Sequence, residues 1–113
     1  MNKFELFTMI FYALDAYYHD VAATDDFVNS VLADMCPFTF TDIGSADPAV
    51  YHKFCDYIGN EDITLDNSYK LANNYVKTID YADVTDAFKM LSEEEWLVAC
   101  KEYLASEHKG ADE

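Results

Sequence analysis

Apolar residues recur at helical spacing along most of the chain, and this periodicity is the feature that most constrains the fold. Steps of three and four predict one apolar helix face, made of Phe7, Ile10, Phe11, Leu14, Tyr17, Tyr18 and Val21, for a helix over about residues 3–20. Shorter stripes follow, among them Phe27, Val28, Val31, Leu32 and Met35, and later Trp96, Leu97, Cys100, Tyr103 and Leu104. Because a helix buries such a stripe against other elements, the pattern predicts an all-α fold.

Residues that cap helices stand at the starts of these stripes. Asp, Ser, Thr and Asn side chains accept hydrogen bonds from the first free backbone N–H groups of a helix. Proline suits the first helical position, and glycine suits the residue after the last one. The predicted starts are Asn2 with Glu5, Thr24, Asp47 before Pro48, Thr64 or Asp66, and Ser92 with Glu95, while Pro37 and Gly59 mark ends.

Together, the apolar stripes and the capping residues predict a compact single domain of five or six short helices over residues 1–106. The helices are too short and too unevenly spaced for a regular four-helix bundle, and only 3 Gly and 2 Pro argue against a turn-rich β fold. An irregular loop is expected near 37–46, and a flexible acidic tail at 107–113. Phe38 and Phe40 either pin that loop to the core or contact a partner.

Acidic residues far outnumber basic ones, and this imbalance narrows the range of partners. The chain has 22 Asp and Glu against 7 Lys and no Arg, for a net charge of −15. Binding to nucleic acid requires cationic side chains that replace the counterions of the phosphates, and anionic membranes require the same. We therefore expect neither direct nucleic-acid binding nor membrane binding, and predict a basic protein as the partner.

No catalytic or cofactor motif stands out, so we expect no enzyme activity and no cofactor. The glycines are isolated, and no local pattern places Cys36 or Cys100 beside a histidine. Three cysteines at wide spacing form no closed disulfide set, which suits a reducing compartment. With no signal peptide or apolar membrane segment in the sequence, we expect a cytoplasmic protein.

Two short clusters are compatible with a metal ligand and keep a metal-binding protein open as an alternative. Asp15 and His19 are four residues apart, and His52, Cys55 and Asp56 also fall on one helix face. Zinc sites usually take three or four protein ligands, and paired Cys-x-x-Cys spacing is absent from this chain. Core packing of Cys55 and solvation of both histidines explain these residues without a metal.

Two acidic edges are the candidate contact sites. The first is expected across the first two helices, and the second at the start of the last helix. Rows of carboxylates on helices imitate the phosphates of a nucleic-acid strand, and a partly exposed Tyr is a common interface residue. Helix capping explains part of the same pattern. The candidate contacts are Asp15, Tyr18, Asp20, Asp25 and Asp26 on the first edge, and Glu93, Glu94 and Glu95 on the second.

These features favour an acidic protein that blocks the basic nucleic-acid-binding surface of a partner. In size and charge alone, the chain is similar to phage and mobile-element proteins that inhibit host defence enzymes, such as anti-restriction and anti-CRISPR proteins. An immunity protein or antitoxin that neutralises a basic toxin is the main alternative. A metal-binding helical protein is another, and negative charge that serves only solubility is the simplest explanation.

Overall fold

The computed structural model describes residues 1–22, 24–36, 47–79 and 83–105, and within these ranges the chain is all-α, as predicted. The predicted loop near 37–46 and the tail at 107–113 lie outside the described residues. The described part contains no strand, and none of its helices is both long and apolar enough to cross a membrane. Its helices are α1 (Lys3–Ala22), α2 (Asp26–Met35), α3 (Pro48–Ile58), α4 (Leu65–Val76), α5 (Asp86–Met90) and α6 (Glu93–Ala105).

Most of the predicted helix boundaries are confirmed by capping hydrogen bonds. Asn2 Oδ1 accepts from the backbone N–H of Glu5 at 2.7 Å, and the backbone N–H of Asn2 donates to Glu5 Oε1 at 2.8 Å. The same reciprocal arrangement joins Thr64 to Asn67 at the start of α4. At the end of α3, Gly59 has a φ of 61°, a conformation that glycine adopts without steric cost.

One cap lies a residue later than predicted. Asp25, and not Thr24, is the N-cap of α2, and its carboxylate accepts from the backbone N–H groups of Phe27 and Val28 at 3.0 and 3.3 Å. Both residue types suit this position, but a carboxylate also interacts favourably with the positive end of the helix dipole. Asp25 was expected in the first turn of this helix, where its side chain would not cap the backbone. As the N-cap, it has a structural role.

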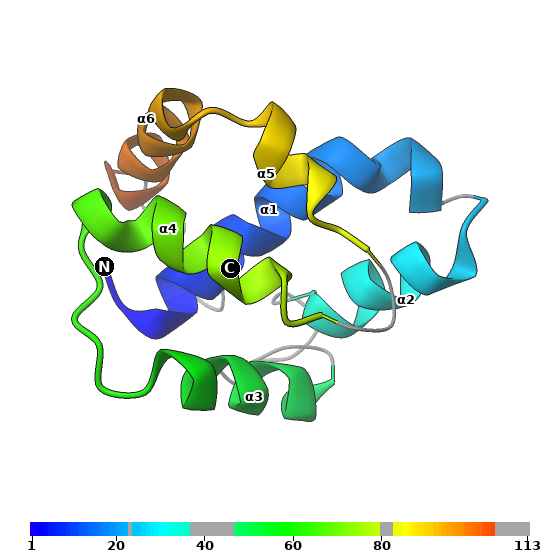
Figure 1. The fold of residues 1–113 in the computed structure, drawn as a ribbon, viewed down its shortest axis with the longest axis horizontal. Helices are drawn as coiled ribbons and strands as arrows, with labels where there is room; N and C mark the ends of the chain where they lie inside the picture. The colour runs from blue at the N-terminus through cyan, green and yellow to red at the C-terminus, as the bar shows by residue number, and fades with distance from the viewer. Residues whose placement is uncertain (23, 37–46, 80–82, 106–113) are drawn as a thin grey trace.

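Helix α1 is the central element of the fold. It contacts α2, α3, α4 and α5, and α4 contacts α6. Figure 1 shows α1 running behind α4, with α3 on one side and α5 on the other. Its Phe7, Ile10 and Leu14 are fully buried, which confirms the central part of the predicted stripe. The described Cα atoms have a radius of gyration of 13.1 Å, the size expected of one small domain of about 100 residues.

Two groups of aromatic rings join the helices around α1. In the first, Phe54 of α3 packs against Phe7 of α1 at 5.1 Å between ring centroids and against Tyr75 of α4 at 4.9 Å. In the second, Phe88 of α5 packs against Trp96 of α6 at 5.4 Å and against Tyr69 of α4 at 5.9 Å. The second group matters for the candidate site because it fixes the short helix α5 to α4 and α6.

Two residues that the periodicity places in the core are exposed instead. Tyr17 is 43% exposed and Phe27 is 66% exposed. Tyr17 is one residue away from the buried Tyr18, and successive helical residues project about 100° apart around the helix axis, so the packing near this end of α1 covers Tyr18 and leaves Tyr17 exposed. Phe27 lies in the first turn of α2, where Val28 takes the inward position. Both aromatic side chains are therefore available at the surface.

Candidate interaction surface

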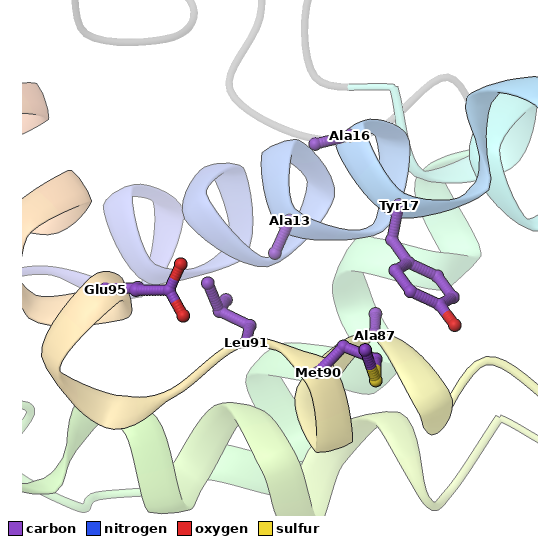
Figure 2. Close-up of a pocket in the computed structure, with 7 residues that line it drawn as sticks. All are labelled: Ala13, Ala16, Tyr17, Ala87, Met90, Leu91 and Glu95. Atoms are coloured by element: carbon purple, nitrogen blue, oxygen red, sulfur yellow. The ribbon is translucent and has the colours of Figure 1, made fainter.

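A shallow apolar groove lies between α1 and the segment that joins α5 to α6. Its volume is about 240 Å³. Figure 2 shows Tyr17 at one end and Glu95 at the other, with Ala13, Leu91, Ala87 and Met90 between them. We call this feature the α1–α5 groove. The residues that line it are Ala13, Ala16 and Tyr17 of α1, Ala87 and Met90 of α5, then Leu91, and Glu95 of α6.

The wall of the groove on the α5 side is held in place by Tyr69 of α4. The Tyr69 hydroxyl lies 2.8 Å from the carbonyl oxygen of Phe88 and 2.6 Å from that of Leu91, so it donates at the end of α5. Burial raises the pKa of Tyr69, and the nearby charge of Glu93 raises it further. The hydroxyl therefore stays protonated at neutral pH and remains a donor.

At the Glu95 end of the groove lies the α6 edge, which consists of Glu93, Glu94 and Glu95. All three residues are exposed in the first turn of α6, where the helix dipole favours negative charge. Glu95 completes the predicted capping box: Ser92 Oγ accepts from its backbone N–H at 3.2 Å, and its carboxylate accepts from the backbone N–H of Ser92 at 3.2 Å. Glu93 and Glu94 are thus the carboxylates of this edge that no capping bond employs.

The predicted first edge is more mixed in character. We call it the α1–α2 edge, and it consists of Asp15, Asp20, Asp25 and Asp26. Asp20 and Asp26 are exposed, Asp15 is half-buried, and Asp25 uses its carboxylate to cap α2. Asp20 does not line the groove, but it lies one helical turn beyond the lining residues Ala16 and Tyr17 on α1.

The prediction that Tyr18 lies at the surface is wrong. Its side chain is only 5% exposed, because it continues the stripe of Phe7, Phe11 and Leu14 on the inner face of α1. Burial raises the pKa of Tyr18, and the nearby backbone of Ala87 opposes that shift. Within the described part of the chain, the buried Tyr18 hydroxyl has no hydrogen-bond partner. Tyr18 therefore packs toward α5 from within, and the neighbouring Tyr17 is the exposed tyrosine.

A second hollow, of about 440 Å³, lies between α1 and α2. It brings Asp15, His19 and Cys36 to one place, although Cys36 is 17 residues from His19 in the sequence. No hydrogen bond joins these three side chains in the described part of the chain. Among the residues described, no group of three or more His, Cys, Asp and Glu is placed to hold a metal ion, at His19 or at His52. The hollow therefore adds no support to the metal-binding alternative.

Of the acidic residues predicted on two separate edges, only Glu95 lines the α1–α5 groove. The tertiary structure brings Glu95, from the second predicted edge, to the far end of a groove that begins at Tyr17. Sequence reasoning missed Met90 and the alanines of α1 as surface features. Met90 lies three residues after the buried Ala87, so helical spacing alone gives no signal that Met90 is exposed.

The chain matches no protein-family model, no curated protein sequence and no solved structure.

Proposed function

We propose that this protein binds a basic, nucleic-acid-binding surface of another protein and blocks it. The observation that carries the proposal is the α6 edge, where Glu93 and Glu94 are exposed and free of capping bonds beside an apolar groove. Carboxylates pair with Lys and Arg through charge-assisted hydrogen bonds, and with Arg in bidentate geometry. They therefore compete with phosphate groups for the same side chains.

The overall charge and the groove support different parts of this mechanism. A net charge of −15 on a chain of 113 residues attracts basic proteins from a distance and repels nucleic acid. Complementary charge mainly raises the association rate and the selectivity of binding, whereas buried apolar contacts slow dissociation. An acidic rim beside an apolar groove supplies both contributions on one face.

The partner class that we favour is a nucleic-acid-binding enzyme, because its substrate cleft carries the required Lys and Arg. A host defence nuclease inhibited by a phage or mobile-element protein is one such case. A basic toxin neutralised by an immunity protein is the alternative. The two are separated by the activity that the protein suppresses once the partner is known.

The first test is capture of partners from host-cell lysate with the tagged protein at low and high salt, followed by assay of the purified partner. We expect one basic enzyme whose binding is lost in high salt and is competed by added DNA or RNA. Inhibition of that enzyme should be relieved by excess nucleic acid. A partner that binds nucleic acid and this protein simultaneously would contradict the blocking mechanism.

Charge-neutral variants then identify the edge that is used. The double variant Glu93→Gln with Glu94→Gln removes two charges from the α6 edge and leaves the Glu95 cap intact. Asp20→Asn with Asp26→Asn tests the α1–α2 edge. The matched control is Asp56→Asn with Glu61→Gln, which removes two exposed charges near the end of α3. We expect the α6 pair to weaken inhibition most; equal effects from all three would indicate attraction by net charge alone.

A further inference from the structure

We infer that the α1–α5 groove receives a segment of the basic partner that carries an apolar side chain flanked by Lys or Arg. This inference rests on the proposed function and adds to it the chemistry of the segment that docks. It is carried by the apolar lining of the groove, by its size and by the carboxylates that lie toward its two ends.

The lining of the groove is apolar and exposes two large side chains. Met90 is 69% exposed and Tyr17 is 43% exposed, although both border a concave surface where a contact would bury them. Methionine is unbranched and polarizable, so it adapts to apolar side chains of different shapes. Tyrosine offers a large ring and a hydroxyl that stays in water, and both residue types are enriched at protein interfaces.

Charge complementarity identifies the flanking residues of the docked segment. Glu95 lies at one end of the groove, as Figure 2 shows, and Glu93 and Glu94 precede it in the first turn of α6. On α1, Asp20 follows Tyr17 by one helical turn, beyond the other end of the groove. None of the lining residues is basic. Lys89 of α5 is 3.2 Å from Asp86, which offsets its charge locally. A docked segment with Lys or Arg on both sides of its apolar side chain would therefore place these cations near the carboxylates toward the two ends of the groove.

The size of the groove favours a side chain over a small-molecule ligand. Its volume of about 240 Å³ is below the roughly 300–1,000 Å³ of pockets that enclose small molecules. One or two apolar side chains of a peptide fit a hollow of this size. The Tyr69 hydrogen bonds to the end of α5 preform one wall, which reduces the ordering that binding requires.

The test uses the full chain and two synthetic probes of equal charge. The first is the capped peptide Lys-Lys-Leu-Phe-Lys-Lys, and the second is Lys-Lys-Ser-Ser-Lys-Lys. Binding is followed by NMR chemical-shift changes of backbone amides and Met methyl groups. We expect the apolar probe to bind about tenfold more tightly, which corresponds to one good apolar anchor. Its largest shifts should fall on the Met90 methyl and on the amides of residues 87–91.

Matched variants separate the groove from the rest of the acidic surface. Met90→Lys and Phe27→Lys each place one positive charge at an exposed apolar residue, since the two side chains are 69% and 66% exposed. Tyr17→Ala and Tyr57→Ala form a second pair, with exposures of 43% and 42%. We expect Met90→Lys and Tyr17→Ala to remove the preference for the apolar probe, and the two controls to retain it.

The outcomes distinguish this inference from the proposed function. Equal binding of both probes, unchanged by Met90→Lys, would overturn the groove as a docking site and leave the acidic surface as the binding determinant. Loss of apolar binding in Phe27→Lys but not in Met90→Lys would overturn the groove and place docking at the start of α2. Failure of both peptides to bind would count against the groove and the proposed function together.

Discussion

The indole N–H of Trp96 donates a 2.8 Å hydrogen bond to the hydroxyl oxygen of Ser68, and both side chains are buried. The Ser68 hydroxyl in turn donates to the carbonyl oxygen of Leu65 at 2.9 Å. This short chain of bonds joins α6 to α4 inside the core and satisfies polar groups that burial would otherwise penalise. It explains how the largest side chain of α6 is buried without an unpaired donor.

Replacement of Ser68 should therefore destabilise the protein more than its small size suggests. Ser68→Ala leaves the buried Trp96 N–H without its acceptor, and we expect a loss of about 1–3 kcal/mol in the free energy of unfolding. Urea denaturation followed by Trp96 fluorescence measures it. Ser30→Ala is the control, because Ser30 is exposed and its bond to the Asp26 carbonyl is local. Equal losses in both variants would contradict a special role for the buried pair.

Tyr69 should position α5 through its hydroxyl. Tyr69→Phe keeps the ring contacts with Phe88 but removes the bonds to the carbonyl oxygens at the end of α5, and we expect it to cost about 1 kcal/mol. Hydrogen exchange should accelerate selectively at the amides of residues 87–91. Tyr57→Phe changes an exposed tyrosine and serves as the control. Unchanged exchange in α5 would show that ring packing alone holds this helix.

Alkaline pH should destabilise the fold because burial favours neutral forms of core groups. Burial raises the pKa of the Cys100 thiol from 9.0 to about 12. A raised pKa means that the folded state retains a proton which the unfolded state loses. The stabilisation is thus complete below pH 9 and is lost as the pH rises from 9 toward 12, at a rate on the order of 1 kcal/mol per pH unit. Urea titrations at several pH values test this.

The variant Cys100→Ala isolates the thiol in that experiment. It should be less stable than the parent at pH 7, because Cys100 is fully buried, but its stability should fall less steeply above pH 9. Burial, followed by the hydrogen bond with Cys55, also raises the pKa of Tyr51, so part of the alkaline loss should persist. An unchanged slope in the variant would exclude Cys100 as a source of the pH dependence.

Asp25 and Asp26 are neighbours, but we expect only Asp25 to contribute strongly to the free energy of unfolding. Asp25→Ala removes the cap of α2 and should cost about 1 kcal/mol, whereas Asp26→Ala should change the free energy of unfolding by less than about 0.5 kcal/mol. Thermal unfolding followed by circular dichroism measures both. If Asp26→Ala proves the more damaging, then α2 is capped differently from the geometry described here.

The helices themselves were predictable because their signals are local. Apolar spacing and capping residues act within a few residues of each other, so the sequence predicted α1, the Asp47 cap of α3 and the Ser92 capping box. It placed the start of α4 at Thr64 or Asp66, and Thr64 is the cap. The predicted cap of α2, Thr24, is one residue before the observed cap, Asp25, and both residue types are good caps. The interpretation of Tyr18 as a surface residue failed because the choice between neighbouring aromatics depends on what packs against the helix.

The sequence alone determined the all-α class, the approximate helix boundaries and the excess of negative charge, since composition and short-range interactions specify each of these. Only the tertiary structure decided which side chains share a surface. Tyr17 is 73 residues from Met90 in the chain, and it shares one groove with Met90 and Glu95 because α5 packs on α1 while Tyr69 holds the end of α5. That arrangement depends on long-range packing, which no local pattern in the sequence encodes.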